Sequence, residues 1–239
     1  MKRIKPSLKD IIYIVIIALL VGGLVTTCVL LFQKKKTQEF GAYYDQKVSA
    51  FKVENANYSK GQIVFIGDSI TDLYHLDEHY VDLPLATYNR GIGGDVTSGV
   101  LNRLEPSLYD LAPSKVVLMI GINDINGRVE KKTIVSNYRK ILNSVKSHLP
   151  DATLFAMSIL PLEEGFDSPS ALQTSTEMII AVNTEIKNMA VKHGYTYCDL
   201  FSLVKDENNH LQKQYSLDGI HLSEAGFVTW TNMMKPLLG

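Results

Sequence analysis

Ile63-Val64-Phe65-Ile66-Gly67-Asp68-Ser69 is the stretch of this 239-residue sequence that decides the fold. Its apolar residues follow one another without the alternation of a half-exposed strand, which predicts a strand buried on both faces. Glycine, aspartate and serine then predict a tight turn into a helix. Further strands are expected at 86–88, 116–120, 154–157 and 195–198.

Amphipathic helical patterns lie between and after these runs. The apolar residues form stripes at helical spacing: Ile134, Tyr138, Ile141, Leu142, Val145 and Leu149; Ile179, Val182, Ile186 and Met189; Phe227, Trp230, Met234 and Leu237. Buried strands that alternate with helices predict an α/β fold, in which a parallel sheet is covered by helices on both faces. Ligands of such sheets bind beyond the carboxyl ends of the strands.

Short polar blocks follow the predicted strands or open the last helix. They are Gly67-Asp68-Ser69-Ile70, Gly91-Ile92-Gly93-Gly94-Asp95, Gly121-Ile122-Asn123-Asp124 and Asp218-Gly219-Ile220-His221-Leu222. Their order along the chain places them at one edge of the sheet. The irregular segment 160–170, which also follows a strand, should hang over the same edge.

The blocks together hold the groups that acyl transfer needs. Ser69 by itself would serve as well as a helix cap. His221 lies three residues after Asp218, a spacing that lets a carboxylate orient the imidazole while the other ring nitrogen deprotonates a serine. Asn123 and the backbone N–H of Gly94, with that of Ser69, would donate to an oxyanion. The sequence therefore predicts a serine nucleophile, a base with its orienting acid, and an oxyanion hole.

These blocks resemble those of the SGNH hydrolases, also called the GDSL esterase/lipase family, over about residues 62–239. The resemblance implies a three-layer α/β/α, flavodoxin-like fold. Matched block by block, it makes Ser69 the nucleophile, His221 the base and Asp218 its orienter, with Gly94 and Asn123 in the oxyanion hole.

Gly91 competes with Gly94 for the glycine role, but the glycine of the family directly precedes an aspartate, here Asp95. The stretches 89–97 and 101–104 resemble more specifically the branch that contains the catalytic subunits of platelet-activating factor acetylhydrolase. That resemblance implies short acyl esters such as acetyl esters, and it leaves the alcohol half of the substrate open.

The N-terminal region is organised differently. Residues 11–32 contain no charged side chain and as a helix would reach about 33 Å, enough to cross a bilayer. We expect a transmembrane signal anchor there, behind a basic cytoplasmic tail at 1–10. A linker with a leading helix at 33–60 and a hydrolase domain at 61–239 would follow, outside the cell membrane. A cleaved signal peptide and a buried core helix are the alternatives.

Composition excludes other classes of protein. A net charge of −1 provides no basic face for nucleic acid. Cys28 and Cys198 are far apart in the sequence, and no disulfide is expected between them. The stretch 75–79 fits the zinc-peptidase pattern H-x-x-E-H, but such a site needs a third ligand from elsewhere, so no metal is expected there. A serine esterase needs no cofactor, and none is expected.

The sequence therefore predicts a membrane-anchored serine ester hydrolase that cleaves short acyl esters of a lipid or a glycan through an acyl-enzyme. Two alternatives stay open: an acyltransferase that uses the same site, and a catalytically silent module that binds a glycan or a lipid. Neither the natural substrate nor the oligomeric state is predicted.

Overall fold

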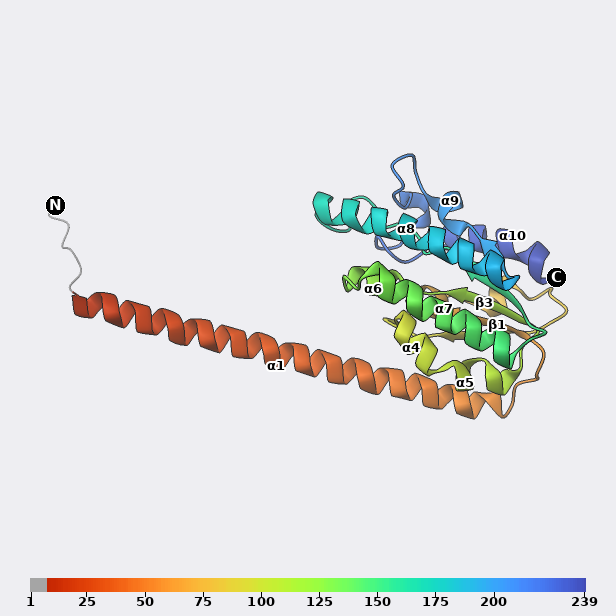
Figure 1. The fold of residues 1–239 in the computed structure, drawn as a ribbon, viewed down its shortest axis with the longest axis horizontal. Coiled ribbons are helices and arrows are strands. Elements are labelled where there is room, and N and C mark those ends of the chain that lie inside the picture. The colour runs from red at the N-terminus through yellow and green to blue at the C-terminus, as the bar shows by residue number, and fades with distance from the viewer. Residues whose placement is uncertain (1–7) are drawn as a thin grey trace. The chain divides into compact units, whose positions relative to one another are not determined.

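The computed structural model describes residues 8–239 (Figure 1). The chain divides into two units, with the boundary between Gln46 and Lys47. For some of these residues the structure describes the backbone and not the side chain: 8, 10–16, 18, 36, 169 and 170. In the first unit every described residue belongs to helix α1, Leu8–Asn55. Residues 1–7, most of the predicted basic tail, are not among the described residues.

Helix α1 contains the whole stretch 11–32 that the sequence predicts to span a membrane. Within the part of the chain that the structure describes, no helix is both long and apolar enough to cross a bilayer. The predicted transmembrane helix is thus without structural support, and part of the stretch, 11–16, has side chains outside the description.

The second unit is built on a parallel sheet with strand order β2-β1-β3-β4-β5. The strands are β1 (Ile63–Gly67), β2 (Thr87–Gly91), β3 (Lys115–Met119), β4 (Thr153–Met157) and β5 (Thr196–Cys198). Each lies within three residues of a predicted strand at either end. The α/β fold with a parallel sheet, predicted from the apolar runs, is confirmed.

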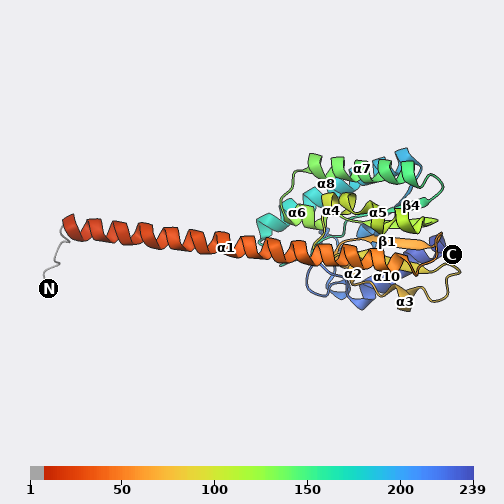
Figure 2. The ribbon, with the colours of Figure 1, turned by 90° about the horizontal axis from the view of Figure 1, so that it is seen from below.

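Helices cover both faces of this sheet, as Figure 2 shows: α7 and α8 lie on one side, and α10 with α2 and α3 on the other. The helices of this unit are α2 (Ser69–Asp72), α3 (Leu76–His79), α4 (Thr97–Asn102), α5 (Leu104–Ser107), α6 (Ile122–Asn126), α7 (Lys131–His148), α8 (Pro169–His193), α9 (Leu200–Val204) and α10 (Glu224–Leu238), with 3-10 turns η1 (Tyr109–Leu111) and η2 (Lys213–Tyr215). Phe65 of β1 packs edge-on against Trp230 of α10, with ring centroids 6.1 Å apart. The layers bury an apolar core on either side of the sheet.

The last turns of α1 belong to the sheet-containing unit. Phe51 is buried under the guanidinium of Arg90, 4.5 Å from the ring centroid. That guanidinium also donates to Glu54 (2.8 Å) and Asn55 (2.7 Å). The leading helix expected within 33–60 is the C-terminal part of α1, which continues without a break to Asn55.

Candidate active site

The turn after β1 displays Ser69. Asp68 caps helix α2 by accepting the backbone N–H of Ile70 at 3.0 Å, so the cap is the aspartate and the serine hydroxyl stays available. A Cβ on Gly67 would lie 2.2 Å from the carbonyl oxygen of Met119 on β3. Only glycine therefore permits the close approach of neighbouring strands that sets this turn.

His221 and Asp218 lie against this serine. The Nε2 atom of His221 is 2.8 Å from Oγ of Ser69, and its Nδ1 atom is 2.7 Å from Oδ2 of Asp218. A carboxylate can only accept, so Nδ1 carries the proton and Nε2 accepts from the serine hydroxyl. The structure thus brings together three residues that lie as far as 152 positions apart in the chain.

Asp218 is held as an anion by its own loop. Burial acts to raise the pKa of this carboxyl, but hydrogen bonds from the backbone and ring of His221 and from the backbone of Ile220 outweigh it and hold the pKa below its ordinary value. The acid therefore remains charged at neutral pH, when it can orient and stabilise a protonated imidazole.

The two glycines proposed for the oxyanion hole have different surroundings. Gly91 is buried, its N–H donates to Oδ1 of Asn89 at 2.8 Å, and a Cβ there would lie 2.1 Å from the backbone nitrogen of Asp72. Gly94 is exposed in a left-handed turn with φ +78°. The side-chain amide of Asn123 donates to the carbonyl of Asp95 at 2.9 Å, which places it beside Gly94. These surroundings favour Gly94 as the backbone donor.

Arg103 connects the parts of the site, and the sequence reasoning assigned it no role. Its side chain is buried, with Nε 2.8 Å from Oδ2 of Asp95. Its Nη2 atom donates to the carbonyl of Gly67 and its Nη1 atom to that of Arg90, each at 2.8 Å. One guanidinium thus ties the ends of β1 and β2 to the loop that follows Gly94. Sequence offers no signal for this burial, because a lone arginine is expected on the surface.

Two further buried carboxylates, Asp124 and Asp68, lie near Asp95. Asp124 accepts the backbone N–H and the hydroxyl of Thr97 at 2.8 and 2.7 Å, which fixes α4 against the start of α6. Oδ2 of Asp68 has no partner among the described residues. Burial raises the pKa of Asp68 to about 7, and the charges of Asp95 and Asp124 act in the same direction.

The histidines of the H-x-x-E-H stretch serve other purposes. His75 is exposed, and Nδ1 of His79 lies 3.0 Å from the hydroxyl of Thr231 on α10. Over the described residues, no three side chains of the metal-ligating kinds gather in an arrangement that could hold an ion. Tyr74 next to them is buried in the core, stacked on Phe227.

A serine, an imidazole and a carboxylate gathered beyond the strand ends of a parallel α/β sheet form the arrangement of a serine hydrolase. The model of the GDSL-like lipase/acylhydrolase family matches residues 65–227. This chain belongs to that family, and it is an ester hydrolase.

Relatives of known identity agree with this assignment. Platelet-activating factor acetylhydrolase IB subunit alpha1 of Homo sapiens is 35% identical over 190 residues, which cover 78% of this chain and 79% of the relative. The same subunit of Pongo abelii matches equally.

Solved structures share the fold. One from Streptococcus pneumoniae, described as a candidate platelet activating factor, is 28% identical with a TM-score of 0.79, over 90% of this chain and 99% of its own. The acetylxylan esterase Axe2 from Geobacillus stearothermophilus is 20% identical with a TM-score of 0.61, over 76% of this chain and 95% of its own. At that identity it shows the fold alone.

Proposed function

We propose that this enzyme removes short acyl groups from their esters by a serine mechanism with a covalent acyl-enzyme. The observation that carries the proposal is the chain of contacts Ser69–His221–Asp218, with lengths of 2.8 and 2.7 Å. Oγ of Ser69 attacks the ester carbonyl carbon while Nε2 of His221 takes its proton. The imidazolium then protonates the departing alcohol. Water, deprotonated by the same nitrogen, attacks the acyl-enzyme and releases the acid and the free serine.

The charge that develops on the carbonyl oxygen needs donors. The backbone N–H groups of Ser69 and Gly94 and the amide of Asn123 are the proposed set. One such donor contributes roughly 2.7–4 kcal/mol to the transition state in known hydrolases. Asn123 is already oriented by its bond to the carbonyl of Asp95, so little reorganisation is needed when the oxyanion forms.

A preference for short acyl chains is supported by the acetylhydrolase relatives. The test is an activity screen of the enzyme with p-nitrophenyl esters of increasing chain length. We expect kcat/KM to be highest for the acetyl ester and to fall as the chain lengthens. A maximum at a long chain would contradict the short-acyl proposal and leave the ester hydrolase intact.

We also propose that residues 11–32 anchor the enzyme in a membrane with the catalytic unit outside. The support is in the sequence: an uncharged stretch with basic residues on both sides. Protease added to intact cells should digest the catalytic unit. Protection until the cells are lysed would contradict this orientation.

Deletion tests the anchor separately. A chain that begins at Lys47 keeps Phe51 and the partners of Arg90, so it should fold and remain active without membrane association. A chain that begins after Asn55 is the contrasting control, because it leaves the buried guanidinium of Arg90 without these partners. If the chain from Lys47 still sedimented with membranes, residues 11–32 would not be the anchor.

A further inference from the structure

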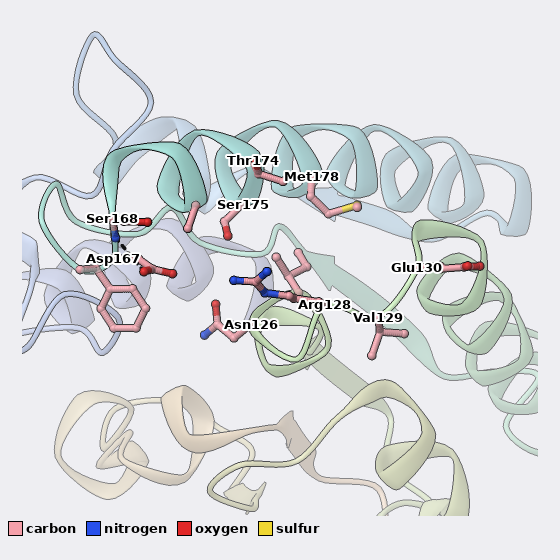
Figure 3. Close-up of a pocket in the computed structure, with 12 residues that line it drawn as sticks. Asn126, Arg128, Val129, Glu130, Asp167, Ser168, Thr174, Ser175 and Met178 are labelled. Atoms are coloured by element: carbon pink, nitrogen blue, oxygen red, sulfur yellow. Dashed lines mark hydrogen bonds between the residues drawn. The ribbon is translucent and has the colours of Figure 1, made fainter. Parts of the chain in front are cut away.

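A cavity of about 640 Å³ lies between the end of α6 and the start of α8 (Figure 3). This volume falls within the roughly 300–1,000 Å³ of small-molecule sites. The side chains that matter for the argument are Asn126, Arg128, Phe166, Asp167, Ser175 and Met178. None of them belongs to the polar blocks that the sequence singled out.

Both walls of the cavity continue segments of the active site. On one side, α6 carries Asn123 and, one turn later, Asn126. On the other side, a Cβ built on Gly219 would lie 2.8 Å from Cδ2 of Phe166, and the backbone of Glu163 donates to the carbonyl of Gly219 at 2.9 Å. Gly219 lies in the loop of the base, two residues before His221. The cavity therefore adjoins the two segments that carry Asn123 and the loop of the base.

One polar side chain of the cavity, that of Arg128, comes from a residue with an unusual backbone conformation. Arg128 has φ +58°, a left-handed conformation that few residues other than glycine adopt. The turn follows directly on α6, with the N–H of Arg128 bonded to the carbonyl of Ile125 at 2.9 Å. In Figure 3 the guanidinium lies between Asn126 and Ser175 within the cavity. Strain of this kind is concentrated at functional sites.

The lining combines hydrogen-bonding groups of several kinds with two apolar surfaces. Arg128, Asn126 and Ser175 supply donors, while Phe166 and Met178 supply apolar area. An alkyl chain would leave the polar groups unsatisfied, at a cost in free energy. A phosphate is also disfavoured, because Asp167 lines the same space as Arg128 and its carboxylate would repel a second anion.

We propose that this cavity binds the leaving group of the ester, and that this leaving group is an uncharged, hydroxyl-rich alcohol of the sugar class. The substrate is then an O-acylated carbohydrate. Hydroxyl groups satisfy donors and acceptors alike, and the C–H faces of a sugar ring pack on Phe166 and Met178. The inference rests on the proposed function, since it assigns the alcohol half of the ester that Ser69 attacks.

The experiment compares two acetyl esters whose leaving groups have the same number of carbon atoms: glucose acetylated at its primary hydroxyl, and hexyl acetate. For the full chain we expect kcat/KM for the sugar ester to exceed that for hexyl acetate by about tenfold or more. Arg128→Gly removes the guanidinium, and glycine accepts the positive φ without strain. That variant should lower the ratio of the two values by about tenfold. The control, Arg139→Ala on the exposed side of α7, should leave the ratio unchanged.

A preference of the wild-type enzyme for hexyl acetate would overturn the sugar assignment, and so would a preference for acetylated glycerol phosphate, assayed as a third substrate. So would a folded Arg128→Gly variant with an unchanged ratio. Hydrolysis of p-nitrophenyl acetate, measured in parallel, distinguishes a failure of the leaving-group inference from a failure of the proposed function. If the wild-type enzyme cleaves that ester but prefers hexyl acetate, only the leaving-group inference fails. If it cleaves none of these esters, the proposed function fails with it.

Discussion

The two halves of the active site are held in different ways. On the nucleophile side, Arg103 and Asp95 form an ion pair in which each side chain is only 1% exposed. On the base side, the side chain of Asp218 is 49% exposed and that of His221 is 23% exposed. The nucleophile half depends on bonds between distant segments, whereas Asp218 is bonded within its own loop.

This difference predicts that substitutions in the two halves affect stability and activity differently. A buried charge that loses its partner destabilises the whole fold, because the charge cannot be hydrated. A solvent-exposed carboxylate can be replaced at little cost in stability, yet its loss misorients the base. Substitutions on the nucleophile side that touch Arg103 should therefore affect both stability and activity, and substitutions on the base side should affect activity alone.

The largest expected effect is on turnover. Ser69→Ala and His221→Ala should each lower kcat by about 10³-fold or more, since the two side chains act as one unit. Their unfolding free energies should stay within about 0.5 kcal/mol of the wild type, because neither side chain is part of the core. Steady-state kinetics with p-nitrophenyl acetate and urea unfolding measure both quantities. A Ser69→Ala enzyme with more than about a tenth of the wild-type kcat would exclude this nucleophile.

Arg103→Met tests the buried network. It leaves the Asp95 carboxylate buried without its cation, which should cost about 3–5 kcal/mol of unfolding free energy. Arg139→Met, at an exposed arginine of α7, is the matched control and should change stability by no more than about 0.5 kcal/mol.

A second change sharpens the test of this pair. Adding Asp95→Asn to Arg103→Met removes the stranded charge and should recover part of the lost stability. If Arg103→Met were as stable as its control in urea unfolding, the pair would not hold this half of the site together.

Asp218→Asn tests the exposed half. The amide keeps the shape but cannot stabilise an imidazolium, so kcat should fall by roughly 10²- to 10³-fold, less than for His221→Ala. Stability at pH 7 should change little, because the side chain is half exposed. Asp82→Asn, at another exposed carboxylate, serves as the control. A loss equal to or greater than that of His221→Ala would mean that Asp218 does more than orient the base.

The smallest predicted effect is a change in the pH dependence of stability. The pKa of Asp68 is raised by burial to about 7 in the folded protein, above its ordinary value of 3.8. The folded state therefore binds more protons than the unfolded state between these values, and stability falls as the pH rises through them.

Asp68→Asn should remove this slope. Between about pH 5 and pH 7 the wild type should lose about 2 kcal/mol more unfolding free energy than the variant. Asp77→Asn, at an exposed aspartate of α3, should keep the wild-type slope. Urea unfolding at several pH values provides the comparison, and parallel curves for wild type and Asp68→Asn would contradict a protonated Asp68.

Much of the sheet was predictable because strands of a buried parallel sheet have uninterrupted apolar sequences. The helical stripes were nearly as informative, with one error. Leu237 was placed in the buried stripe of α10 but is 40% exposed, while Leu238 is buried. Trp230, Met234 and Leu238 continue the stripe at steps of four residues, and a period of 3.6 permits a step of either three or four.

The two halves of the site also differ in how far their polar contacts could be predicted from the sequence. The Asp218–His221 pair is close in sequence, so local spacing predicted the contact that the structure shows. The burial of Arg90 and Arg103 was not predictable, because their partners come from segments that only the fold brings together. The cavity beside Phe166 was hidden for the same reason, since its walls come from the end of α6 and the start of α8.

The most direct test of the account is covalent labelling of the nucleophile. A p-nitrophenyl phosphonate, a mimic of the tetrahedral intermediate, should react with the wild-type enzyme and attach to Ser69, as read by mass spectrometry of the peptides. The same reagent should label His221→Ala far more slowly, because the hydroxyl then lacks the base that lies 2.8 Å away. Label on another residue, or equal labelling of the wild type and His221→Ala, would contradict the claim that His221 activates Ser69.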